Sequence, residues 1–126
     1  MEKHHYFPLL TDLTEKKFLV IGSGHAGMQR VRALLGFTRH LYVLTPDPGE
    51  ELLQLASEGR LTLLRKNYER EDLFPMDYVT SCTGDDRIDT DVYVTSRTLG
   101  IRVNLAGDPG RCDFFFPDTA GSPSEQ

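Results

Sequence analysis

A glycine-rich turn stands directly after an apolar stretch near the start of the chain. The run Lys17-Phe18-Leu19-Val20-Ile21 leads into Gly22-Ser23-Gly24-His25-Ala26-Gly27, and a helix-patterned segment follows. A Gly-x-Gly-x-x-Gly sequence between a strand and a helix is typical of the turn that binds a dinucleotide pyrophosphate. Gly22 permits the tight turn, Gly24 lets the backbone approach the phosphates, and Gly27 lets the helix pack closely. The unpaired N–H groups at the start of the helix would face the anion.

The rest of the chain alternates between apolar, strand-like stretches and helical patterns. Strands are predicted at residues 17–21, 41–45, 61–65, 78–82 and 101–105, with a sixth at 112–116, and helices at 27–35, 50–58 and 88–99. This alternation is typical of a Rossmann-like, doubly wound α/β fold, with a mostly parallel five- or six-stranded sheet and helices on both faces. Residues 1–118 are predicted to form one dinucleotide-binding domain, and residues 119–126 a disordered tail.

The spacing of apolar residues assigns faces to the helices. The apolar face of the first helix carries Gly27, Val31, Leu34 and Leu35. Its opposite face, which is expected to point away from the sheet, carries Gln29, Arg30 and Arg32. Asp85 and Asp86 precede the third helix, so we expect them to cap its N-terminus rather than to bind a metal.

Composition and charge exclude several classes of function. The chain has 126 residues, with 14 Lys and Arg against 19 Asp and Glu and a net charge of −5. It has no run of basic residues, so nucleic acid is not an expected partner. The apolar runs are only a few residues long, which argues against a membrane partner and makes the cytoplasm the expected location. Cys82 and Cys112 are expected to be reduced and partly buried, and no metal-ligand spacing is present.

Four segments carry a more specific pattern. They are Phe7-Pro8-Leu9-Leu10, Val20 to Ala26, Thr83 to Asp86, and Val103-Asn104 through Asp108-Pro109 to Asp113-Phe114-Phe115-Phe116-Pro117. In this order they resemble the N-terminal dinucleotide-binding domain of the precorrin-2 dehydrogenase and sirohydrochlorin ferrochelatase family, the dehydrogenase part of siroheme synthases. The glycine turn alone is generic, whereas the segment that begins at Asn104 is much more diagnostic.

The resemblance implies an NAD-dependent oxidation of precorrin-2 to sirohydrochlorin in siroheme biosynthesis, and some relatives also insert iron. The substrate would be a small-molecule tetrapyrrole. The residues assigned to the cofactor NAD are Gly22, Ser23, Gly24, His25 and Ala26 in the turn, Thr45, Pro46 and Asp47 after the second strand, and Thr83, Gly84 and Asn104 beyond it.

Asp47 bears on the choice between NAD and NADP. A carboxylate near the end of the second strand can accept a hydrogen bond from a ribose hydroxyl and would repel a 2′-phosphate, so NAD is the expected cofactor. Asp47 stands between two prolines, however, and could equally shape a turn or cap the following helix.

The catalytic residue is less conventional. Typical members of the family carry an Asp, the favoured acid or base, at the position of Gly107 in this chain. Asp108 is the candidate in its place, since one residue of slippage moves a side chain by only about 3.5 Å. Asp108 could equally be a turn residue before Pro109. The Asn near the start of the family's fourth helix is Asp89 here, which we expect to be solvated.

The partners and the activity both depend on what covers this domain. Family members continue past the aromatic segment into a dimer-forming region, so a homodimer, or a partner chain that supplies this region, is expected here. Consecutive aromatic residues at 114–116 would leave one face of a strand uncovered without it. The alternative function is a catalytically degenerate dinucleotide-binding or ligand-sensing module, which Gly107 favours.

Overall fold

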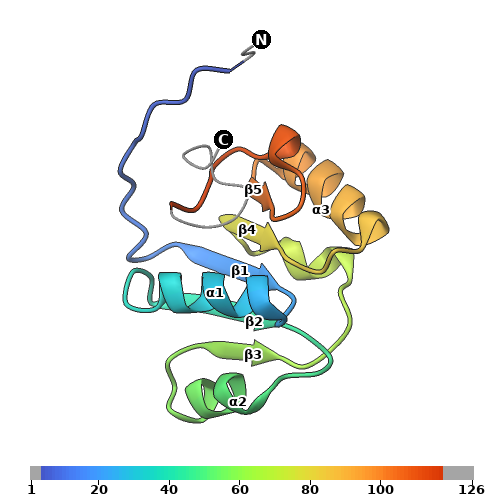
Figure 1. Cartoon of the computed structure of the whole chain (residues 1–126). Helices are drawn as coiled ribbons and strands as arrows, with labels where there is room; N and C mark the ends of the chain where they lie inside the picture. The colour runs from blue at the N-terminus through green and yellow to red at the C-terminus, as the bar shows by residue number, and fades with distance from the viewer. Residues whose placement is uncertain (1–3, 118–126) are drawn as a thin grey trace.

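Five parallel strands form one sheet in a computed structural model that describes residues 4–117 (Figure 1). They are β1 (Lys17–Ile21), β2 (His40–Leu44), β3 (Thr62–Leu64), β4 (Tyr78–Ser81) and β5 (Arg102–Leu105). Their order across the sheet is β3-β2-β1-β4-β5. Successive strands are therefore added on one side of β1 up to β3 and on its other side from β4 onward, which makes the boundary between β1 and β4 the switch point of the sheet. This is the doubly wound, Rossmann-like arrangement that the sequence predicts, with five strands rather than six.

Helices cover both faces of the sheet. They are α1 (His25–Leu34), α2 (Glu50–Ser57) and α3 (Asp86–Leu99), joined by the 3-10 helices η1 (Arg70–Leu73) and η2 (Pro109–Arg111). Val31 of α1 and Leu52 of α2 pack with Val20 on one face, whereas Val92 of α3 packs with Leu19 and Leu73 on the other. Gly100 ends α3 with φ +75°, a left-handed conformation that favours glycine.

At the carboxyl edge of the sheet, the residue that follows each of β1, β4 and β5 still donates a backbone hydrogen bond to the neighbouring strand. The N–H of Gly22 donates to the Leu44 carbonyl at 2.9 Å, and the N–H of Cys82 donates to the Ile21 carbonyl at 2.8 Å. The N–H of Ala106 likewise donates to the Ser81 carbonyl at 2.9 Å. The loops after β1, β4 and β5 therefore start from fixed positions along one edge.

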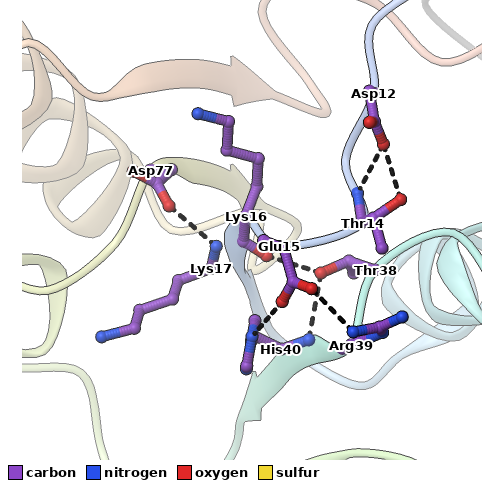
Figure 2. A network of polar contacts seen from close by, with 9 residues as sticks. All are labelled: Asp12, Thr14, Glu15, Lys16, Lys17, Thr38, Arg39, His40 and Asp77. Atoms are coloured by element: carbon purple, nitrogen blue, oxygen red, sulfur yellow. Dashed lines mark hydrogen bonds and ion pairs between the residues drawn. The ribbon is translucent and has the colours of Figure 1, made fainter.

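The amino edge is held by side chains (Figure 2). The Glu15 carboxylate pairs with Arg39 at 2.7 Å and with His40 at 3.1 Å, which joins the segment before β1 to the start of β2. The N–H of Lys17 donates to the Asp77 carboxylate at 2.8 Å, which joins β1 to the loop before β4. These contacts lie at the opposite edge from the glycine turn.

The sixth strand predicted at residues 112–116 does not form. The N–H of Asp113 donates to the Val103 carbonyl at 2.7 Å, but the N–H groups of β5 that a ladder needs are taken by side chains. Val103 donates to the Asp113 carboxylate at 3.0 Å and Leu105 to the Cys112 sulfur at 3.2 Å. The segment instead crosses the sheet face irregularly, where Phe114 and Phe116 pack around Phe18.

Two charged side chains predicted to face solvent are buried. Arg30 is 3% exposed and lies against β4 and β5, as described below. Asp89 is 8% exposed, and the Ser81 hydroxyl donates to its carboxylate at 2.6 Å across the interface between α3 and β4. Burial raises the pKa of the Asp89 carboxyl, because the charged form loses hydration that one hydroxyl does not replace.

The tail predicted to be disordered, residues 119–126, lies outside the described residues. Within residues 4–117, no helix is both long and apolar enough to cross a membrane.

Replacing Asp89 with Asn is expected to stabilise the protein increasingly as pH rises. The folded-state pKa of Asp89 lies above its ordinary value of 3.8, so the folded protein holds a proton that the unfolded chain releases. Stability from that proton is complete below pH 3.8 and is lost as pH rises through the folded-state pKa. The amide of the Asp89→Asn variant does not titrate and still offers an acceptor to Ser81. Urea unfolding of both proteins between about pH 4 and pH 8 measures the difference.

Asp91 provides a control of opposite sign on the same helix. Its pKa is lowered, chiefly because Arg70 donates to its carboxylate. Asp91→Asn should therefore destabilise the protein near neutral pH, and this loss should shrink as pH falls. A constant stability difference between wild type and Asp89→Asn across the pH range would contradict the assignment for Asp89.

Candidate functional site

The turn between β1 and α1 requires two of its glycines for close backbone contact. Gly22 has φ +100°, and a Cβ on it would lie 3.0 Å from the Cys82 carbonyl oxygen. A Cβ on Gly27 would lie 2.0 Å from the carbonyl oxygen of Gly22, far inside van der Waals contact. The first turn of α1 therefore packs directly against the backbone that follows the C-terminal end of β1, which is the close approach predicted for the third glycine.

Gly24 is different, because a Cβ at this position would meet no protein atom within 4 Å. Gly24 is exposed and precedes α1, whose first backbone bond runs from the Met28 N–H to the Gly24 carbonyl at 2.9 Å. The N–H groups of His25, Ala26 and Gly27 thus lie before the helical ladder begins. Open space beside a helix N-terminus fits a pyrophosphate, since both the N–H groups and the helix dipole favour an anion.

Hydroxyl groups join this turn to the loop after β2. The Ser23 hydroxyl donates to Thr45 Oγ1 at 3.0 Å and to the Asp47 carbonyl at 3.3 Å. The Asp47 N–H also donates to Thr45 Oγ1, at 3.2 Å. Thr45 is buried, whereas Pro46 and Asp47 are exposed. The Ser23 and Thr45 side chains are thus used within the protein, and the Asp47 carboxylate is left at the surface beside the turn.

Thr83 and Gly84 lie across the switch point, at the carboxyl end of β4. Both are exposed, and Gly84 has φ +73°. The Thr83 hydroxyl accepts from the Asp85 N–H at 3.1 Å. The Asp85 carboxylate in turn accepts from the N–H groups of Arg87 at 2.9 Å and Ile88 at 3.4 Å, so Asp85 caps α3 as predicted.

Asn104 lies below this edge rather than on it. It is 3% exposed, and its side-chain oxygen accepts hydrogen bonds from Arg30 Nη1 and from the Thr80 hydroxyl. Its Nδ2 donates to the Phe114 carbonyl at 2.9 Å. Arg30 was not predicted to lie here, although it follows Gly27 by three residues and so shares the buried side of α1. Direct contact between Asn104 and a cofactor stays a prediction.

The candidate acid, Asp108, belongs to the loop after β5. Its Oδ2 accepts from Arg111 Nε at 2.6 Å, and this bond raises the pKa of the Arg111 guanidinium. Arg111 also approaches Thr90 at 3.5 Å and Asp86 at 3.8 Å. The Asp108 side chain remains 38% exposed, and a Cβ on the neighbouring Gly107 would meet nothing. The loop can therefore present Asp108 to solvent at the carboxyl edge.

The remaining reactive groups do not form a second centre. Cys82 and Cys112 are free thiols, and burial raises the pKa of each. Among the described residues, no three His, Cys, Asp or Glu side chains are grouped to hold a metal ion. His25 is exposed at the first position of α1, beside the glycine turn.

Sequence comparisons identify the family of the chain. A family described as NAD(P)-binding matches residues 9–118. A multifunctional siroheme biosynthesis protein, HemA, of Ruminiclostridium josui is 32% identical over 111 residues, which is 88% of this chain and 22% of that protein. The siroheme synthase of Pseudoalteromonas translucida is 30% identical over 112 residues, which is 89% of this chain and 24% of the relative. The chain thus spans about a quarter of the length of these relatives.

A comparison with solved structures finds a similar fold. The structure of SirC, a precorrin-2 dehydrogenase, superposes with a TM-score of 0.72 at 22% identity, over 89% of this chain and 55% of SirC. That likeness concerns the fold. The chain belongs to the NAD(P)-binding family, as a Rossmann-like domain similar to the N-terminal domain of siroheme synthases.

Proposed function

We propose that this domain binds NAD and oxidises precorrin-2 to sirohydrochlorin. The single observation that carries the proposal is the open glycine turn at the switch point, with the Asp108 loop on the same edge of the sheet. Support for the substrate comes from the similarity to siroheme synthases over this domain. The same relatives support a wider role in siroheme biosynthesis.

Different residues along the carboxyl edge of the sheet would bind the two halves of NAD and accept the proton. The N–H groups from His25 to Gly27 would hold the pyrophosphate, and Asp47 would accept from the adenosine ribose. Thr83 and Gly84 would border the other half of the dinucleotide. Bound NAD supplies the hydride acceptor, and the substrate loses one hydride and one proton in all. Asp108 would take that proton, held in place by Arg111.

The tetrapyrrole also needs walls that residues 4–117 do not provide. Two hollows of the described surface lie along α3 and at its C-terminal end, and neither is lined by a residue of the glycine turn or of the Asp108 loop. We propose that a second copy of the chain, or a partner chain, covers the substrate. Phe115, which is half-buried, and the exposed Phe7 and Leu10 would face such a partner, whereas Phe114 and Phe116 pack on Phe18.

A binding module without chemistry of its own is the second candidate. The observation in its favour is Gly107, which removes the family's usual carboxylate and leaves only Asp108, already paired with Arg111. Such a module would bind NAD and never reduce it. The two functions therefore differ in turnover and agree in cofactor binding.

Gly24→Val should abolish NAD binding without unfolding the protein. The new side chain would meet no protein atom but would fill the space proposed for the pyrophosphate. We expect the Kd for NAD, measured by calorimetry, to rise by at least about tenfold, or 1.4 kcal/mol. Gly49→Val is the matched control, since Gly49 also precedes a helix in extended backbone with open space around it. Equal NAD affinity in wild type and Gly24→Val would remove the cofactor assignment.

The wild-type domain should prefer NAD to NADP, and Asp47→Ser should reduce this preference. Loss of the carboxylate removes a ribose acceptor and a charge that repels a 2′-phosphate, so we expect the Kd ratio to fall about tenfold. Glu50→Gln, which removes a nearby exposed carboxylate from the first turn of α2, should leave the ratio unchanged. A wild-type preference for NADP would instead point to Arg65 as the group that pairs with the 2′-phosphate. Arg65 lies near the Asp47 loop, because the carbonyl of the preceding Leu64 accepts a hydrogen bond from the Thr45 N–H.

Asp108→Asn should abolish sirohydrochlorin formation and leave the Kd for NAD intact. Loss of a positioned acid or base lowers turnover by about 10²–10⁴-fold. Asp86→Asn is the control, because it removes the more distant carboxylate near Arg111 and spares Asp108. The assay follows sirohydrochlorin optically with precorrin-2 and NAD. Turnover that survives in Asp108→Asn would keep the enzyme and discard the residue, whereas an inactive wild type that binds NAD would establish the binding module.

A further inference from the structure

Arg30 is a buried cation in the middle of the domain. It belongs to α1, and its Nη1 donates to the Thr80 hydroxyl of β4 at 2.8 Å and to the Asn104 oxygen of β5. Its guanidinium carbon also lies 4.4 Å from the centre of the Phe116 ring. One side chain thus reaches from the helix that follows the glycine turn to two strands and to the segment that covers them.

This cation has no carboxylate partner among residues 4–117. The ionisable groups that face it are the thiols of Cys82 and Cys112, and burial keeps both thiols protonated by raising their pKa. Arg30 Nε has no hydrogen-bond acceptor in the described part of the chain. A buried guanidinium with neither a counter-charge nor full hydrogen bonding costs free energy that a neutral side chain would avoid.

The polar groups around Arg30 do not need it for their own hydrogen bonding. The Thr80 hydroxyl donates to Asn104 Oδ1 at 2.8 Å, and Asn104 Nδ2 donates to the Phe114 carbonyl at 2.9 Å. If Arg30 became methionine, the Thr80 hydroxyl could still donate to Asn104, and the aliphatic stem would still fill the space, although Asn104 Oδ1 would keep only one of its two donors. Folding stability alone therefore does not account for a charge at this position.

The contact with Asn104 gives Arg30 another role. Two donors on Asn104 Oδ1 fix the orientation of the amide, so that its Nδ2 faces the Phe114 carbonyl. Asn104 also precedes, by two residues, the loop from Ala106 to Asp108. The orientation of one amide thus bears on both the Asp108 loop and the segment from Cys112 to Phe116.

We propose that Arg30 is a positioning residue, which fixes the Asn104 amide and thereby holds the Asp108 loop and residues 112–116 in register with the glycine turn. It does so without touching cofactor or substrate. Its effect on turnover rests on the proposed dehydrogenase function. Its effect on the order of these two segments does not, so the two can be tested separately.

The test compares Arg30→Met with Arg32→Met on the same helix. Arg32 is exposed and bonds only to Glu51 among the described residues, so its variant is a matched control for loss of one arginine. Hydrogen exchange is measured at the amides of Ala106 and Asp113, which donate to Ser81 and Val103. Arg30→Met should fold, bind NAD within about threefold of wild type, and exchange these two amides at least about tenfold faster relative to those of β1 and β2.

Kinetics supply the second readout. With precorrin-2 as substrate, Arg30→Met should lower kcat by about 10–100-fold, with little change in KM for NAD, because the reacting groups are misplaced while the turn is intact. Arg30→Lys should recover part of kcat, since an ammonium can donate to Thr80 and Asn104. If Arg30→Met fails to fold, Arg30→Gln, which is shorter and neutral, is expected to give the same pattern.

Each result has a defined consequence. Uniformly faster exchange throughout the domain, with kcat per folded molecule unchanged, would show that Arg30 is merely structural and would overturn the proposal. Unchanged exchange at Ala106 and Asp113 would overturn it as well. A wild-type protein without turnover would refute the dehydrogenase function, and the exchange comparison would still decide whether Arg30 holds these segments.

Discussion

The close contact between the first turn of α1 and the end of β1 sets the position of everything else in the site. Gly27 lies so near the Gly22 carbonyl that any side chain there would collide with the backbone. Gly22 approaches the Cys82 carbonyl in the same way, so the turn is also held against β4. Because α1 starts from this fixed point, its next turn carries Arg30 over β4 and β5. A loss of contact at Gly27 would therefore move the helix N-terminus and the buried cation together.

The fold and the geometry of the glycine turn could be predicted from the sequence because both depend on local signals. Alternating strands and helices specify a parallel sheet, and a parallel sheet brings the carboxyl ends of its strands to one edge. The glycine turn uses backbone N–H groups, which are present whatever the neighbouring side chains are. Ser23 and Thr45 add only short hydroxyl bonds between adjacent loops. Glycine spacing after an apolar run therefore carries most of the information.

The incorrect predictions have physical causes of one kind. Arg30 and Asp89 were expected in solvent because they are charged, although helical spacing places Arg30 with Gly27 and Val31, and Asp89 with Val92, on buried faces. Both side chains are buried despite their charge because each has a hydrogen-bond partner on a strand, Asn104 for Arg30 and Ser81 for Asp89. Residues 112–116 were expected to be a strand because three of the five are phenylalanine. The side chains of Cys112 and Asp113 instead occupy the edge N–H groups of β5, which sequence pattern alone does not reveal.

The loop after β5 is held by side-chain pairs, whereas the glycine turn is held by backbone contacts. The loop after β5 is short and tight, with the Asp108 N–H bonded to the Leu105 carbonyl at 3.1 Å. Gly107 has open space around it, so the loop loses no packing where the family's carboxylate is missing. The Asp108 carboxylate is oriented by Arg111, three residues further on, through a bond of 2.6 Å. Because Arg111 lies in η2 and reaches Thr90 of α3 at 3.5 Å, the Asp108 side chain is supported by these elements rather than by the sheet.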